Sequence, residues 1–226
     1  MKQMLLDFQP APVPSLVNFV VGRNQELIDA LRTLPLAEQG AASLYVWGES
    51  GSGKTHLLKA ATALYLSRGL NAAYVEEATD WSRLSAYDAV AVDNVQNLDE
   101  DSQVGLFNLF NEFRDAGRPL IVAGRDAPQA LEVRPDLRTR LGWGLVYQVQ
   151  ALSDDEKSQA LQRHANERGF RLPQEVIDYL LAHVRRDLPT LMGVLDSLDK
   201  WSLTAKKPVT VSLLKQLLQP ASSPTQ

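Results

Sequence analysis

A glycine-rich segment in the first quarter of the chain has the residue types and spacing of a phosphate-binding loop. The segment Gly48-Glu-Ser-Gly-Ser-Gly-Lys-Thr55 matches the pattern G-x-x-x-x-G-K-[ST] in full. Its glycines let backbone N–H groups turn inward, its lysine can reach terminal phosphates, and its threonine can bind Mg²⁺. The alternative is a glycine–serine turn without a ligand, which does not require the whole pattern. The residues that we expect to contact a nucleotide are Gly48, Ser50, Gly51, Ser52, Gly53, Lys54, Thr55 and His56.

A carboxylate that follows another apolar run could complete a Mg²⁺ site with Thr55. Asp93 comes directly after Ala89-Val-Ala-Val92, and a carboxylate at the end of a parallel strand orients Mg²⁺ in phosphate-loop proteins. On its own, Asp93 could equally cap a turn in Asp-Asn-Val. The next residue, Asn94, cannot accept a proton from an attacking water. We therefore expect ADP or ATP to bind with Mg²⁺, and hydrolysis by this chain to be weak or absent.

These residues need a sheet that brings the ends of several strands together. Short apolar runs bounded by turn residues predict five buried parallel strands. The runs are 43–47, 72–75, 89–92, 120–123 and 145–149. Helical patterns at 54–68, 100–116 and about 136–141 alternate with them, as in an α/β domain whose sheet is covered on both faces. The phosphate loop then joins a strand to a helix, which is the context its chemistry requires.

The pattern changes after Gln150. Ser153-Asp-Asp-Glu156 is a capping box, and the rest of the chain has helical periodicity. The predicted helices are 154–168, 174–185, 188–204 and 210–218. We expect an α/β nucleotide-binding domain over 18–150 and a small helical domain over 151–219. The flanking segments are a peptide (1–8), a proline-rich linker (9–17) and a disordered tail (220–226).

The amino-acid composition excludes several classes of protein and function. The chain has 226 residues, of which 45% are hydrophobic and 22% charged, so it can form a globular core. Its net charge of -4 disfavours tight, direct DNA binding. It has no cysteine, and its three histidines lack metal-ligand spacing, which excludes disulfides and a thiolate zinc site. Neither a signal peptide nor a long apolar span is present, so we expect a cytoplasmic protein without a membrane partner.

Several stretches together resemble the AAA+ module of the DnaA family of bacterial replication initiators. They are Phe19-Val-Val-Gly-Arg-Asn24, the phosphate loop, Ala89-Val-Ala-Val-Asp-Asn94, Arg138-Thr-Arg-Leu-Gly-Trp-Gly144 and Leu152-Ser-Asp-Asp-Glu-Lys157. The resemblance covers about residues 17–219 and implies an α/β AAA+ P-loop domain with a five-stranded parallel sheet, followed by a small all-α lid. An initiator continues beyond the lid into a helix-turn-helix domain, whereas this chain stops there. In that respect it looks like the Hda family of DnaA-related regulatory inactivators.

The resemblance implies a function and partners. Hda-like proteins bind the β sliding clamp of DNA polymerase III once it is loaded on DNA, and they promote hydrolysis of the ATP held by DnaA. The chain would then inhibit replication initiation and reach DNA only through the clamp. The clamp-binding peptide would comprise Gln3, Met4, Leu5, Leu6 and Phe8. These apolar side chains could alternatively pack onto the domain.

The family also suggests roles for residues at three other places. Arg140 matches the arginine finger, which would act in trans on DnaA; the alternative is a surface salt bridge. The segment Val20-Val21-Gly22 would contact adenine, or else form ordinary core. Pro189 stands where the sensor 2 arginine is expected, with Arg185 and Arg186 nearby.

Two other functions remain open from the sequence. One is a self-sufficient AAA+ ATPase of the helicase-loader type, and the other is a DnaA-derived adaptor that does not stimulate hydrolysis. An exposed finger and an exposed nucleotide edge would also permit head-to-tail homo-oligomers. For the sensor 1 position, the sequence leaves open whether Arg125 or Asp126 faces the nucleotide.

Overall fold

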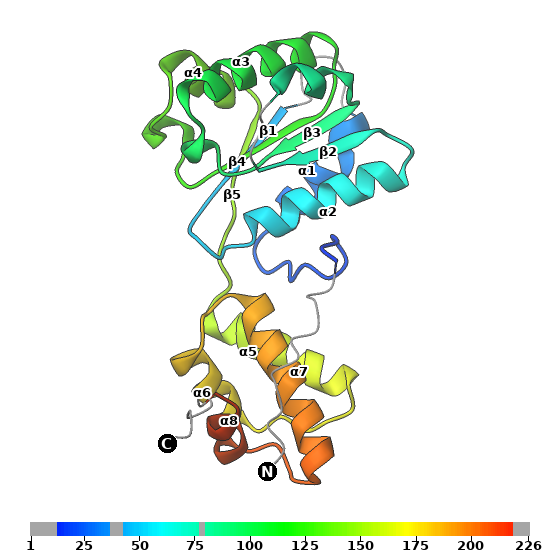
Figure 1. Cartoon of the computed structure of the whole chain (residues 1–226), viewed down its shortest axis with the longest axis vertical. Coiled ribbons are helices and arrows are strands. Elements are labelled where there is room, and N and C mark those ends of the chain that lie inside the picture. The colour runs from blue at the N-terminus through cyan, green and yellow to red at the C-terminus, as the bar shows by residue number, and fades with distance from the viewer. Residues whose placement is uncertain (1–12, 37–42, 77–79, 219–226) are drawn as a thin grey trace, which may run out of the picture. The chain divides into compact units, whose positions relative to one another are not determined.

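The computed structural model of the chain describes residues 13–36, 43–76 and 80–218. These residues form two compact units, an α/β unit over Val13–Ala151 and a helical unit that starts at Leu152. Figure 1 shows the strands gathered in the first unit and helices alone in the second. The α/β unit includes Leu16, which is buried although the sequence places it in the linker.

The α/β unit is built on a five-stranded sheet of order β2-β3-β4-β1-β5. All four neighbouring pairs of strands are parallel, as predicted. The strands are β1 (Ser43–Trp47), β2 (Ala72–Val75), β3 (Ala89–Val92), β4 (Leu120–Gly124) and β5 (Leu145–Gln148). The expectation that all five are buried is wrong for β5. This strand lies at one edge of the sheet, and Leu145 and Val146 are 41% and 39% exposed because neither side chain belongs to the buried core on either face.

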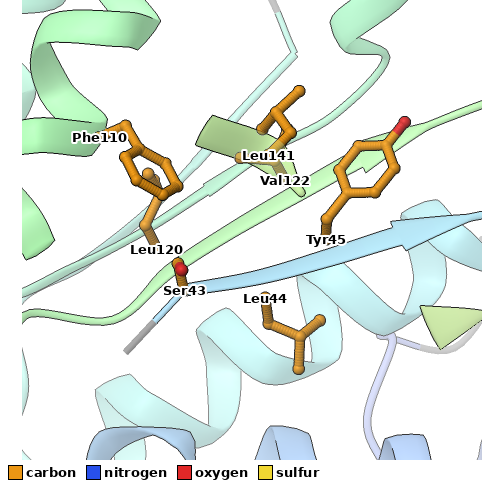
Figure 2. Close-up of a pocket in the computed structure, with 7 residues that line it drawn as sticks. All are labelled: Ser43, Leu44, Tyr45, Phe110, Leu120, Val122 and Leu141. Atoms are coloured by element: carbon orange, nitrogen blue, oxygen red, sulfur yellow. The ribbon is translucent and has the colours of Figure 1, made fainter. Parts of the chain in front are cut away.

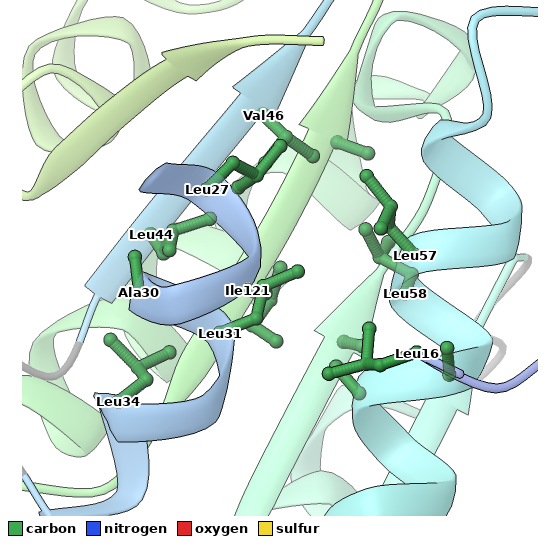
Figure 3. Close-up of a cluster of buried hydrophobic side chains, with 14 of the residues drawn as sticks. Leu16, Leu27, Ala30, Leu31, Leu34, Leu44, Val46, Leu57, Leu58 and Ile121 are labelled. Carbon is green, nitrogen blue, oxygen red and sulfur yellow. The ribbon is translucent and has the colours of Figure 1, made fainter. Parts of the chain in front are cut away.

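Alternate side chains of the central strands enter two separate cores. On one face, residues such as Leu44, Val46 and Ile121 pack against α1 (Gln25–Thr33) and α2 (Lys54–Ser67), as Figure 3 shows. On the other face, side chains such as Tyr45 and Val122 pack against α3 (Glu100–Asp115) and α4 (Pro135–Leu141). Figure 2 shows Leu44 and Tyr45 leaving β1 on opposite sides; the space on the Tyr45 side leaves no room for a water molecule. The sheet is therefore covered on both faces, as the alternation of strands and helices predicts.

Helix α1 was not predicted from the sequence. Its buried side chains Leu27, Ile28 and Leu31 follow a helical repeat and form part of the first core. Among the residues that the structure describes, four short 3₁₀ helices were also not predicted: η1 (Leu34–Leu36), η2 (Trp81–Ala86), η3 (Val95–Asn97) and η4 (Pro128–Ala130).

The described part of the second unit, residues 152–218, forms four helices with a core of their own. They are α5 (Asp154–Glu167), α6 (Gln174–His183), α7 (Leu188–Ala205) and α8 (Val211–Leu218). The predicted capping box begins α5: the Ser153 hydroxyl accepts from the N–H of Glu156, and the Glu156 carboxylate accepts from the N–H of Ser153. Helix α6 ends before the predicted residue 185, because the backbone is extended at Val184. Within the described residues, no helix is long and apolar enough to cross a bilayer.

Candidate nucleotide-binding site

The phosphate loop joins β1 to α2 and has the backbone of an anion cradle. Gly53 precedes the first residue of α2 at φ 106°, a left-handed conformation that side chains rarely adopt. A Cβ at Gly53 would lie 2.9 Å from the ring of Phe19, and one at Gly48 would lie 2.8 Å from the carbonyl oxygen of Val149. Because the helix N-terminus carries partial positive charge, this cradle suits a phosphate group.

Two side chains of the loop suit a phosphate. The Lys54 ammonium donates to the carbonyl oxygens of Gly48 and Glu49, at 2.6 and 2.9 Å. Burial lowers the pKa of Lys54, and the negative charge of Asp93 partly opposes that effect. The Ser52 hydroxyl is buried and has no hydrogen-bond partner among the described residues. Both groups can therefore donate hydrogen bonds to a bound anion.

Asp93 joins the phosphate loop, as the Mg²⁺ prediction requires. Its carboxylate is completely buried. The Thr55 hydroxyl donates to Oδ2 at 2.6 Å, and the backbone N–H of Asn94 donates to Oδ1 at 2.9 Å. A turn cap accounts for the bond from the N–H of Asn94. It does not account for the bond from Thr55, which joins the first turn of α2 to the residue that follows β3. Thr55 and Asp93 fit Mg²⁺, which often takes few protein ligands and completes its shell with waters and phosphate oxygens.

A tyrosine not identified in the sequence completes the surroundings of Asp93. The Tyr74 hydroxyl, from β2, donates to Asp93 Oδ2 at 2.9 Å. Burial, followed by the charge of Asp93, raises the pKa of Tyr74, so the phenol stays protonated. The available signal was the position of Tyr74 near the end of a strand, but the contact also requires knowing that β2 and β3 are neighbours.

Asn94 adopts a left-handed backbone conformation, with φ 53° and ψ 44°. Its side-chain oxygen accepts from Gln96 at 3.4 Å, and the Gln96 oxygen accepts from the N–H of Arg125 at 3.1 Å. Gln96, not identified in the sequence, thus connects the end of β3 to the end of β4. The side chain of Arg125 lies 3.8 Å from Asp126. Both charges act on the pKa of Lys54, Arg125 lowering it and Asp126 raising it.

The segment expected to contact adenine lies near Gln150, the second residue after the end of β5. Val20 and Val21 are half-buried, and Gly22 has φ 48°. Asn24 fixes the segment, because its amide donates to the carbonyls of Val21 and Gln150 and its oxygen accepts from the N–H of Gln150.

His56, also expected to contact the nucleotide, faces the N-terminal segment. Its Nε2 lies 3.0 Å from the carbonyl oxygen of Ser15, and its ring centroid is 5.6 Å from that of Phe19. Phe19 in turn lies against Gly53. His56 therefore connects residues 15–19 to the first turn of α2.

Arg140 stacks on aromatic side chains. Its guanidinium lies 3.9 Å from the ring centroid of Trp143 and 5.4 Å from that of Phe107 in α3. Trp143 is 55% exposed. Among the described residues Arg140 forms no ion pair, and its buried Nε has no hydrogen-bond partner. Within that part of the chain, the alternative that Arg140 forms a surface salt bridge is therefore wrong. By contrast, Arg134 pairs with Asp136 at 3.0 Å.

The basic residues near the sensor 2 position form ion pairs with carboxylates of the helical unit itself. Arg185 lies 3.3 Å from Asp187, and Arg186 lies 3.6 Å from Asp154. Pro189 is in the first turn of α7, which Asp187 caps by accepting from the N–H of Thr190 at 3.0 Å. Residues 3–8, the expected clamp peptide, lie outside the described residues.

The chain is similar to known proteins along most of its length. Residues 154–218 match the family described as the Hda lid domain, and residues 70–148 match the family described as the bacterial DnaA ATPase domain. An uncharacterized protein of Haemophilus influenzae is 35% identical over 228 residues, which cover 96% of this chain and 98% of that protein.

Two solved structures have the same fold. Domain III of DnaA from Thermotoga maritima superposes with a TM-score of 0.74 at 24% identity, covering 93% of this chain and 98% of that one. AMPPCP-bound DnaA from Aquifex aeolicus gives a TM-score of 0.69 at 24% identity, covering 86% and 70% of the two chains. The α/β unit and helical unit therefore have the fold of a DnaA AAA+ module with its lid.

Proposed function

Because the chain belongs to the Hda family of DnaA-related AAA+ proteins, we propose that it is a negative regulator of bacterial replication initiation. In this proposal, the protein binds an adenine nucleotide and is held on the DNA-loaded β sliding clamp. From there it stimulates ATP hydrolysis by DnaA through Arg140. Water attacks the γ-phosphorus of the DnaA-bound ATP, the bond to the β–γ bridging oxygen breaks, and ADP and phosphate leave. A cation beside the transferring group stabilises the charge of this transition state.

The position of Arg140 is the observation that carries the proposal. Arg140 lies on the α3 face of the sheet, next to Phe107, whereas the phosphate loop leads into α2 on the opposite face. This separation disfavours action on the chain's own nucleotide. Its guanidinium has no competing carboxylate among the described residues, and the neighbouring Trp143 is exposed. An arginine so placed is suited to a nucleotide held by another molecule.

The nucleotide proposal rests on the geometry of the loop. Lys54 and the free Ser52 hydroxyl would bind phosphate oxygens, and Thr55 with Asp93 would hold Mg²⁺. Mg²⁺ would neutralise phosphate charge when bound. The AMPPCP-bound state of the DnaA from Aquifex aeolicus, which has the same fold, supports a nucleotide here.

Turnover without DnaA separates this proposal from a self-sufficient ATPase of the helicase-loader type. We expect the protein alone to release phosphate from ATP at a rate close to that of a Lys54→Ala variant, because Asn94 offers no base. Phosphate release measured with and without clamp-loaded DNA would test this. Sustained turnover by the protein alone, lost in Lys54→Ala, would instead support the ATPase.

Clamp binding by the N-terminal peptide is the other part of the proposal. Deletion of residues 1–8 is expected to abolish binding to isolated clamp, since the contacts would come from Gln3, Met4, Leu5, Leu6 and Phe8. Surface plasmon resonance with immobilised clamp measures this. The deletion should leave ADP affinity unchanged, because the described nucleotide site contains no residue before Phe19 other than Ser15 behind His56. Undiminished clamp binding by the deletion would refute the peptide assignment.

A further inference from the structure

The carboxylate of Asp93 has no contact with solvent and depends on three donors for its hydrogen bonds. Burying a charged group without such partners is costly. One donor is the backbone N–H of Asn94, and another is the Thr55 hydroxyl, which the proposed Mg²⁺ site also uses. The third is the hydroxyl of Tyr74. Tyr74 is therefore the side chain whose contact with Asp93 serves no other part of the proposed site.

Strand β2 holds Asp93 at two points. The backbone N–H of Asp93 donates to the carbonyl of Val75 at 2.8 Å, which extends the pairing of β2 with β3 by one residue. The Tyr74 hydroxyl then binds the Asp93 side chain on the face covered by α2. The first contact fixes where the backbone of Asp93 lies, and the second fixes how its carboxylate is turned.

The ring of Tyr74 is itself held in place. It packs against the core beneath α2, and the ammonium of Lys59 lies 4.8 Å from its centroid. A hydroxyl carried on a packed ring reaches one point in space with little freedom, which suits it to orienting a second group. A phenol is also protonated at neutral pH, so it donates to the carboxylate and does not repel it.

From this geometry we infer that Tyr74 is a positioning residue for Mg²⁺-dependent nucleotide binding, acting by holding the Asp93 carboxylate. This inference rests on the proposed nucleotide function. Side chains that hydrogen-bond to metal-binding carboxylates commonly contribute about 10- to 100-fold to metal affinity. In this site the contribution would come from a strand that carries neither the phosphate loop nor Asp93.

The test compares ADP affinity in Mg²⁺ with ADP affinity in EDTA for wild type and Tyr74→Phe. We expect the ratio of the two affinities to fall by about 10-fold or more in Tyr74→Phe, while the affinity in EDTA stays unchanged. Tyr65→Phe is the matched control. It removes a buried hydroxyl that donates to the Leu31 carbonyl at 2.8 Å, and it should lower the melting temperature without changing the ratio.

A double variant provides a second measurement. In an Asp93→Asn background, adding Tyr74→Phe should cause no further change in the ratio, because the two residues act as one unit. An unchanged ratio in Tyr74→Phe, or additive losses in the double variant, would overturn the inference and leave nucleotide binding intact. Equal ADP affinities of the wild-type protein in Mg²⁺ and in EDTA would also overturn the inference and leave nucleotide binding intact. If wild type binds no ADP under either condition, both the inference and the proposed nucleotide function fail.

Discussion

Replacing Arg140 with alanine is expected to reduce the stimulation of DnaA ATP hydrolysis by about 100-fold or more. A finger supplied in trans contributes roughly 10³ to 10⁵ in rate, and the guanidinium of Arg140 stacks on Trp143 without pairing with a carboxylate among the described residues. The assay mixes ATP-loaded DnaA, clamp-loaded DNA and this protein, and measures phosphate release. Affinity for ADP should stay at the wild-type level, because Arg140 lies on the face of the sheet opposite α2. Affinity for the clamp should also stay unchanged, since the proposed clamp contacts come from residues 1–8.

Arg114→Ala is the matched control for loss of charge at the same surface. Arg114 also lies beside Trp143, at 5.7 Å, but its guanidinium pairs with Asp115 at 2.7 Å. We expect this variant to retain stimulation within about fivefold, the scale of an exposed ion pair. Equal stimulation by Arg140→Ala and wild type would contradict the finger and favour the adaptor alternative.

The indole of Trp143 should contribute through Arg140. A cation–π contact contributes about 0.5 to 2 kcal/mol, so Trp143→Ala should lower stimulation by about 2- to 30-fold. In an Arg140→Ala background, the same change should lower it no further. Additional loss in the double variant would mean that Trp143 contacts DnaA independently of Arg140.

The sheet could be predicted because its signals are local. Each strand is a short apolar run between turn residues, and central strands in a sheet covered on both faces need continuous apolar sequence. That rule fails at β5, where Leu145 and Val146 remain exposed. An apolar run identifies a strand but does not say whether other elements cover both faces of that strand. Helix α1 does carry a local repeat of apolar residues, Leu27, Ile28 and Leu31, so the sequence alone is sufficient to predict it.

The phosphate loop and Asp93 could be predicted because each follows a strand and has a defined residue type. The contacts made by Tyr74 and Arg140 could not. The first depends on the register that places Tyr74 opposite Ala91 on neighbouring strands, and the second depends on side-chain rotamers around Trp143. Neither the order of the strands nor a rotamer follows from residue types and spacing along the chain.

Lys54→Ala is expected to weaken ADP and ATP binding by at least about 10- to 100-fold. Hydrogen bonds to charged groups contribute about 1.5 to 3 kcal/mol, and the ammonium of Lys54 lies within the loop, on the carbonyls of Gly48 and Glu49. Calorimetric titration in Mg²⁺ would measure the loss. Lys200→Ala, at an exposed position of α7, should change affinity by less than about fivefold. Equal nucleotide affinities for wild type and Lys54→Ala would contradict the phosphate-binding role of the loop.

The pH dependence of ADP binding follows from the same lysine. Burial lowers the pKa of Lys54, and only its protonated form carries the charge that attracts phosphate. The affinity for ADP should therefore be highest when the pH is well below the pKa of Lys54, and it should fall as the pH rises through this pKa. The fall should occur at a lower pH than it would for a lysine with an ordinary pKa. Titrations between about pH 8 and 10 cover the range in which ADP phosphates are already ionised and lysines lose protons.

Lys54→Gln separates this effect from general alkaline unfolding. The amide cannot titrate, so its weaker binding should show no decline over the same range as long as the protein remains folded. A parallel decline in both proteins would assign the pH dependence to another group. A decline in wild type alone would show that the loop binds phosphate through the charge of Lys54, and would link the buried position of that side chain to the conditions under which the nucleotide is held.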